Sequence, residues 1–357
     1  MSLVHRSLLQ TFLRILALTL VGALVLFTLV DLLDNIGSFL DNQATLSMVL
    51  RYYMYKIVWI VDLVLPIAML MATLFTVGTM ARYNELTALF AAGRSLVQVT
   101  QPLLALAVVM SMFSFAWREY VLPEANIART QVWEVEIHKR AERIRPTTNI
   151  ALTGGDGRIY FARTFNPQTL TLTGLRVVTT KSAQVVERLD ASRAIWAGRY
   201  WLLYDGSRRD FAHEEETVTP FDVLPATSLA ITPESFEAAR VRPEDMNIGQ
   251  LQRHIDMVRK SGGDVTDSAV DVQFLLAWPV VHIIVVFLGI LLASGPRKTT
   301  IASGFGWTLL ISFGYYLSMN FGRALGHNGT LAPVVAGWAG NGLYGLIGWG
   351  LWMRARR

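Results

Sequence analysis

Very few side chains in this 357-residue chain have the types and spacing that metal binding or catalysis requires. His213 is followed by Glu214, Glu215 and Glu216, and an imidazole beside three carboxylates offers ligands for a metal ion. Consecutive residues of a strand point to alternate faces, so at most two of the four share a direction. A solvated loop or strand edge is therefore the stronger interpretation, and we predict no metal site and no catalytic residue.

A nucleotide site within the chain is also unsupported. The segment GPRKTT (295–300) lacks the glycine pair and the Gly-Lys step of a phosphate-binding loop, so its backbone amides are not arranged to surround phosphates. The chain has no cysteine, which excludes disulfides and cysteine-ligated metals. We expect no cofactor in this chain.

Ionisable residues within apolar runs are the remaining candidates. Asp62 lies four residues before Pro66 in a long apolar window, where a charge needs an ion partner or an aqueous cavity, and a functional and a structural role both stay open. For His282, also in an apolar run, a hydrogen-bonded position between helices is the simpler interpretation. Asp31 and Asp34 end the first apolar run, where solvation at the membrane interface accounts for them.

The composition indicates a membrane protein, because 52% of the residues are hydrophobic and only 17% are charged. A helix of roughly 20 apolar residues crosses a hydrocarbon core about 30 Å thick. Six windows have this length: residues 15–33, 57–80, 96–117, 272–294, 299–321 and 331–353. The first apolar run is longer than the roughly 7 to 15 residues of a signal peptide, so we count it as a span. We expect a polytopic α-helical membrane protein with six transmembrane helices.

Lysines and arginines in the short connections predict the orientation of these helices. With the N-terminus in the cytoplasm, the inner side carries Arg6, Arg14, Arg82, Arg94, Arg297, Lys298, Arg354, Arg356 and Arg357. The short outer connections carry Arg51, Lys56 and Arg323. This asymmetry favours cytoplasmic N- and C-termini and places the long central segment outside. The net charge of +5 follows from this topology and does not require nucleic acid as a partner.

The long central segment changes character along its length. Residues 123–145 contain no glycine and favour a helical stalk that continues the third span. Four later stretches alternate apolar with polar residues: GRIYFAR, TLTGLRVVTT, VVERLDASRAIWA and RYWLLYDGSRRDF. With turns at GGDG (154–157) and YDGS (204–207), they predict a sandwich or a jellyroll-like pair of sheets. A short helix over 248–260 follows, capped by Asn247. We predict domains at 1–117, 118–271 and 272–357.

The connection between the second and third spans, ARYNELTALFAAGRS (81–95), is compatible with a helix. At 100° per residue, Leu86, Leu89, Phe90 and Gly93 share one face, and Glu85 lies at its margin. One interpretation is a helix lying on the membrane surface. Such helices are usually rich in lysine and arginine, whereas this one carries an acid and small residues, which suit the docking of another protein.

Five segments resemble the LptF/LptG (YjgP/YjgQ) permease family: LPIAML (65–70), NELTALFAAGRS (84–95), VLPEANIA (121–128), RPEDMNIGQL (242–251) and LGHNGTLAPVVAGWAGN (325–341). The resemblance implies a membrane permease subunit of an ABC exporter that extracts lipopolysaccharide from the inner membrane of Gram-negative bacteria. It also implies six spans with an inserted periplasmic β-jellyroll. The ending of the chain is similar to LptG more than to LptF.

The family's partners follow from the same resemblance. They are a second LptF/LptG-type permease as heterodimer, an LptB-like ATPase dimer that holds ATP and Mg, and LptC-like and LptA-like periplasmic bridge proteins. Glu85 matches the family's coupling-helix glutamate, which would seat in the ATPase. We therefore expect a coupling site made of Arg82, Asn84, Glu85, Leu86, Leu89, Phe90 and Gly93.

The lipid side of the prediction rests on fewer residues. Candidates for a lipid cavity or gate are Asp31, Asp34, Arg51, Lys56, Asp62 and Arg323. The outer end of the first span is acidic here, where some family members carry basic residues suited to lipid A phosphates. A different class of protein, a secondary transporter or membrane-anchored sensor with Asp62 as an ion or proton site, is the alternative.

Overall fold

The computed structural model describes residues 3–138, 147–154, 158–181, 184–211, 217–238, 246–260, 265–295 and 301–355. The chain divides into two compact units. The helical unit comprises Met1–His138 and Thr266–Arg357, and the sheet unit comprises Lys139–Val265. The segment that follows the third predicted span, as far as residue 138, therefore packs with the helical unit.

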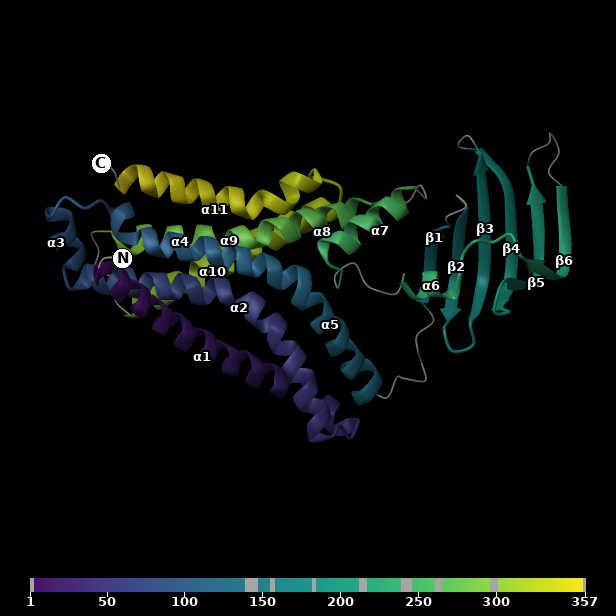
Figure 1. Ribbon diagram of the computed structural model, residues 1–357, viewed down its shortest axis with the longest axis horizontal. Helices are drawn as coiled ribbons and strands as arrows, with labels where there is room; N and C mark the ends of the chain where they lie inside the picture. Colours follow the sequence, from purple (N-terminus) through teal and green to yellow (C-terminus); the bar gives the residue numbers. More distant parts are fainter. Residues whose placement is uncertain are drawn as a thin grey trace. The chain divides into compact units, whose positions relative to one another are not determined.

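The helical unit is built from long helices joined by short turns (Figure 1). Its first half contains α1 (Leu3–Asp41), α2 (Leu46–Arg82), α3 (Glu85–Ala91), α4 (Leu96–Ala116), η1 (Trp117–Val121), α5 (Leu122–Gln131) and η2 (Val132–Ile137). Its second half contains α8 (Thr266–Ala277), η5 (Trp278–Val280), α9 (Val281–Ala293), α10 (Ile301–His327) and α11 (Pro333–Ala355). Helix α3 and both ends of the chain lie at the same end of this unit (Figure 1).

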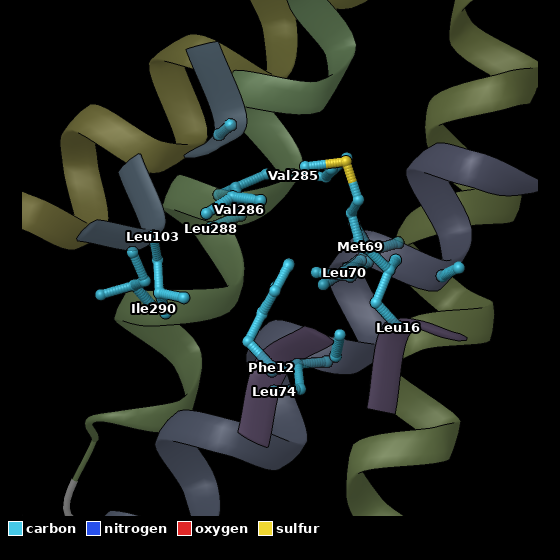
Figure 2. Packing of buried hydrophobic residues seen from close by; sticks show 14 of the residues in the cluster. Phe12, Leu16, Met69, Leu70, Leu74, Leu103, Val285, Val286, Leu288 and Ile290 are labelled. Atoms are coloured by element: carbon cyan, nitrogen blue, oxygen red, sulfur yellow. The ribbon is translucent and has the colours of Figure 1, made fainter. Parts of the chain in front are cut away.

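Helix α2 is the centre of the helical core. It packs against α1, α5, α9 and α10, and its residues Met69, Leu70 and Leu74 are buried. Figure 2 shows these side chains beside Phe12 of α1 and Val285 of α9. Helices α2 and α9 approach closely at Gly289, where a β-carbon would lie 2.9 Å from the side chain of Thr73.

Four helices among the described residues are long and apolar enough to cross a membrane: Leu3–Asp41, Leu46–Arg82, Leu96–Ile137 and Thr266–Ala293. They contain the first three predicted windows and all but the last residue of the fourth. Helices α10 and α11, with 27 and 23 residues, cover most of the other two windows. Glycines recur in both helices, which lowers their hydropathy.

Several of the long helices change their hydrogen-bond pattern along their length. The third span continues through two π-helical segments, η1 and η2, and the fourth is interrupted by the 3₁₀ turn η5 at Pro279. Pro66 within α2 has no backbone N–H, so the carbonyl of Asp62, four residues earlier, loses its helical partner. Such irregularities often mark functional positions in helices.

The sheet unit holds six antiparallel strands whose order follows the chain, β1 to β6 (Figure 1). They are β1 (Thr147–Thr153), β2 (Ile159–Asn166), β3 (Thr171–Lys181), β4 (Gln184–Trp196), β5 (Trp201–Asp210) and β6 (Thr217–Ala226). Four of them confirm the strands predicted from alternating residues. In the described residues these strands form a single sheet instead of the predicted pair, because each one pairs with its neighbour in sequence.

One face of the sheet carries the core of this unit. Trp201, Tyr160 and Phe165 are fully buried there, and Phe236 of the short helix α6 (Pro233–Ala238) packs on the last of these rings. The indole of Trp201 donates to the carbonyl of Ile231 at 2.8 Å, which ties the segment before α6 to the sheet.

Two predictions about turns and caps in the sheet unit have opposite outcomes. The predicted turn YDGS is wrong: it lies inside β5, where Asp205 adopts φ 49° and its carbonyl accepts the hydroxyl of Ser192 at 3.0 Å. The turn GGDG lies outside the described residues except for Gly154. Helix α7 (Ile248–Lys260) is confirmed with its cap, because Gln250 N donates to Asn247 Oδ1 at 2.8 Å.

Candidate functional site

The connection between α2 and α4 is a defined, tight structure. Asn84 has φ 62° and turns the chain out of α2, and α3 follows for seven residues. At its end Arg94 N donates to Leu89 O at 3.0 Å and Gly93 N donates to Phe90 O at 2.9 Å. These two bonds form a Schellman motif around Gly93, whose φ is 78°. The loop therefore presents α3 in one fixed orientation.

The predicted helix over 81–95 is too long. Residue 82 still belongs to α2, and Ser95 caps α4 through a reciprocal pair of bonds with Gln98. The left-handed residue Asn84 and the left-handed Gly93 limit the helix at its two ends, because neither conformation continues an α-helix. Within residues 81–95, the separate helix therefore comprises only the seven residues Glu85–Ala91.

The face predicted for α3 divides into a packed part and a free part. Leu86 is 2% exposed and belongs to the helical core, and Leu89 packs against that core. Phe90 remains 41% exposed, and Arg82 and Gly93 also lie at the surface. The loop is thus anchored by leucines while an aromatic ring stays available at its surface.

A groove of about 530 Å³ runs along the inner side of α3. Glu85, Ala88 and Leu89 line it from α3, and the first turns of α1 and the last turns of α2 complete it. Glu85 itself is exposed. The only carboxylate of the loop is therefore placed at the mouth of a mainly apolar groove, accessible to a partner from outside the chain.

Asp62 has an ion partner that the sequence did not predict. Arg118 Nε lies 3.1 Å from Asp62 Oδ1 and 3.0 Å from Oδ2, and Nη2 lies 2.8 Å from Oδ2. The guanidinium also stacks on the ring of Trp278, 4.4 Å from its centroid. Arg118 was missed because it follows the third apolar window by one residue. An acid inside one span and a cation ending the next is the signal that could have found it.

An apolar pocket of about 330 Å³ opens beside this ion pair in the helical unit. Its lining residues come from α1, α2, the η5–α9 segment and α10: Phe27, Leu63, Pro66, Ile67, Trp278, Val281, Val285, Leu309, Ser312, Phe313, Tyr315 and Tyr316. None of the six residues predicted for a lipid cavity or gate is in this lining. Leu63 follows Asp62 directly in the chain, and Trp278, on which Arg118 stacks, is also in the lining.

The other predicted lipid-side residues form separate clusters. Asp31 pairs with Lys56 and accepts the hydroxyl of Tyr53 at 3.1 Å, so solvation alone is the wrong explanation for this aspartate. Asp34, one turn further along α1, is exposed. Arg51 makes two bonds to the carboxylate of Glu136, at 3.1 and 2.5 Å.

The last of these clusters joins α8 to α10. Arg323 Nε and His327 Nε2 lie 2.7 and 2.8 Å from Oδ1 of Asp271. Asp271 is 9% exposed, and the guanidinium of Arg323 also lies over the ring of Phe274, 5.2 Å from its centroid. This arrangement fixes the C-terminal end of α10 to α8.

In the described ranges, no three His, Asp or Glu side chains are placed to hold a metal ion. His213 and the three glutamates after it lie outside the described residues. His282 is fully buried, and its Nδ1 lies 3.0 Å from the carbonyl oxygen of Pro279, as the interpretation of a hydrogen-bonded histidine between helices requires.

A family model described as lipopolysaccharide export system permease LptF/LptG matches residues 6–354. No curated protein matches the chain significantly. The matched region includes the α3 loop, the apolar pocket and each of the ion pairs described above.

Proposed function

We propose, from the premise that this chain belongs to the lipopolysaccharide export permease family LptF/LptG, that it is the subunit through which an ABC exporter moves the lipid out of the inner membrane. Family membership makes the chain a transport component rather than an enzyme and a part of the lipopolysaccharide export system. ATP hydrolysis then takes place on a separate LptB-like ATPase dimer, which carries ATP and Mg.

The observation that supports this proposal best is the geometry of the α3 loop. Two left-handed residues and a Schellman motif fix α3, Leu86 anchors it to α2, and Glu85 stays exposed beside a groove. A movement of α3 is thereby passed directly to the central helix. We propose that the ATPase binds this loop through Glu85 and the ring of Phe90.

We further propose six spans with both termini in the cytoplasm and the sheet unit in the periplasm. Both chain ends lie beside α3 in the helical unit (Figure 1), in agreement with the charge asymmetry of the sequence. A second LptF/LptG-type permease completes the complex, and LptC-like and LptA-like proteins continue the path from the sheet unit. We propose that this chain is the LptG-like member.

The alternative of a secondary transporter has no comparable support. A proton or ion relay at Asp62 needs a carboxylate that changes its protonation or ligands. Here that carboxylate accepts three close contacts from Arg118, which occupy both of its oxygens.

The test is affinity purification of the chain from its native membrane in mild detergent, with mass spectrometry of the retained proteins. Wild type should retain an ATPase and a second permease, and Glu85→Lys should lose the ATPase while its helical unit stays folded. Glu124→Lys is the matched control, because Glu124 is also an exposed glutamate in the first turn of a helix, α5. Retention of the ATPase by Glu85→Lys, or a wild type that purifies alone, contradicts the proposal.

A further inference from the structure

We propose that Asp62 and Arg118 are a positioning pair that holds Trp278 as the rigid wall of the apolar pocket, where an acyl chain of the transported lipid rests. This inference rests on the proposed function for the identity of the ligand. The positioning of Trp278 is a property of this chain and can be measured without lipopolysaccharide.

The three residues come from three different elements. Asp62 lies on the central helix α2, Arg118 lies in the π-helical segment η1, and Trp278 begins the 3₁₀ turn η5. Asp62 is 5% exposed and the side chain of Arg118 is 13% exposed. The planar guanidinium meets the carboxylate with its edge and the indole with its face. One side chain therefore couples the acid on α2 to the ring on η5.

Trp278 depends on this stacking more than a buried tryptophan usually does. Its Nε1 is buried and has no hydrogen-bond partner in the described residues. Buried indoles usually bind a partner through this N–H group. Phe274 contacts the same ring at 5.8 Å between centroids, but this contact is within the α8–η5 segment and does not tie the ring to α2 or α4.

The position of Arg118 is itself fixed by its neighbour. Trp117 Nε1 donates to the carbonyl of Val58 on α2 at 3.2 Å, one turn before Asp62. The π-helical segment begins at this residue, so η1 is attached to α2 at two successive positions. The guanidinium is thereby directed at the pocket wall and not at solvent.

The pocket lies on the other side of this assembly. Trp278 and Leu63, the residue after Asp62, are both in its lining, and Pro66 lies one turn further along α2. Its lining is mostly aliphatic and aromatic, which suits a hydrocarbon chain. Without the pair, the ring of Trp278 can rotate into the 330 Å³ space or away from it, and the pocket loses its shape.

The experiment uses the full chain with its co-purifying partners in nanodiscs. One readout is the ¹⁹F resonance of 5-fluorotryptophan at position 278, assigned by its loss in Trp278→Phe. The other is photo-crosslinking of lipopolysaccharide to p-benzoylphenylalanine in place of Phe313, which lines the pocket. The same probe in place of Leu346, an exposed residue of α11 outside the described lining, controls for general access of lipid.

Two variants separate positioning from stability. Asp62→Asn leaves Arg118 as an unpaired buried charge and can unfold the protein. The double variant Asp62→Asn with Arg118→Gln leaves no unpaired charge and removes the stacking cation. We expect it to fold, to shift and broaden the Trp278 resonance, and to raise the lipopolysaccharide content for half-maximal crosslinking at position 313 about five- to tenfold, in line with the loss of a desolvated cation–π contact.

The outcomes distinguish this inference from the proposed function. An unchanged Trp278 resonance in the folded double variant overturns the positioning role, as does a changed resonance with wild-type crosslinking at position 313. If the resonance shifts but wild type itself never crosslinks lipopolysaccharide at position 313, the pair still positions Trp278 and the lipid assignment of the pocket is wrong.

Discussion

The hydroxyl of Tyr315 on α10 donates to Oδ1 of Asn341 on α11 at 2.5 Å, and both side chains are buried. Asn341 in turn donates from Nδ2 to the carbonyl of Ala277 at 2.8 Å. In the 3₁₀ turn the amide of Val281 bonds to Trp278 O and Pro279 O, so it does not make the α-helical bond to Ala277 O. One asparagine thus joins the start of this turn to a tyrosine of the pocket wall.

Replacement of Asn341 by alanine should therefore destabilise the helical unit. It leaves the buried Tyr315 hydroxyl without its partner, at a cost of about 1–3 kcal/mol, and removes the side-chain bond to the Ala277 carbonyl. Thermal unfolding followed by tryptophan fluorescence in detergent measures the loss. Asn320→Ala is the control, because the Asn320 side chain bonds to Tyr316 O within α10. Equal unfolding midpoints for the two variants contradict the role of this network.

The conformation of Gly93 can be tested apart from its surroundings. A β-carbon at Gly93 would meet no atom within 4 Å, so only its φ of 78° opposes a side chain. Gly93→Ala should cost about 1 kcal/mol in the stability of the loop and weaken ATPase binding. Gly342 in α11 also has open space but an ordinary φ, so Gly342→Ala should be neutral or stabilising. Amide hydrogen exchange in residues 83–95 measures the difference, and equal exchange in both variants contradicts it.

The two parts of the α3 face should respond differently to truncation. Leu86→Ala removes a buried side chain and should destabilise the connection between α2 and α4 by about 2–3 kcal/mol. Phe90→Ala removes an exposed ring and should change stability by less than about 0.5 kcal/mol, while it lowers retention of the ATPase. Unfolding midpoints and co-purification separate the two effects. A loss of stability in Phe90→Ala as large as in Leu86→Ala would show that the ring packs against the unit.

The sequence predicts elements whose physics is local, and the structure agrees with it there. The apolar windows, the alternating strands and the Asn247 cap depend on residues close in the chain. The limits of α3 also follow from local residues, but the left-handed Asn84 has no distinctive sequence signal, because asparagine is equally common in turns and caps.

The partners of buried charges could not be predicted in the same way. Arg118 is 56 residues from Asp62, and Asp271 is 52 residues from Arg323. Such pairs depend on which helix faces which, and the local pattern of residues along the chain does not determine that. The sequence does establish that a partner must exist, because Asp62 lies in an apolar span. The prediction of a turn at YDGS is wrong for a related reason. Tyr204, Gly206 and Ser207 pair with β4 on both sides of the left-handed Asp205, so a turn-like sequence stays within one strand.

The sheet unit carries a carboxylate whose ionisation should contribute to its stability. Burial acts to raise the pKa of Asp190, but hydrogen bonds from Arg188 and Arg176 outweigh it and hold that pKa below its ordinary value. A carboxyl group with a lowered folded-state pKa stabilises the fold above the unfolded-state pKa of about 3.9. This contribution is lost as the pH falls through the folded-state pKa.

Asp190→Asn should therefore make the sheet unit more sensitive to pepsin at about pH 5, where Asp190 is charged in wild type. The difference between variant and wild type should shrink as the pH falls below the unfolded-state pKa of about 3.9, because protonation of the carboxyl then favours the unfolded state. Cleavage rates within residues 139–265 of the full chain, compared at each pH, measure this. Asp222→Asn on β6 changes an exposed carboxylate and is the control. A difference between Asp190→Asn and wild type that stays constant from about pH 5 to about pH 2 would mean that the arginines stabilise the sheet by packing and not through the charge of Asp190.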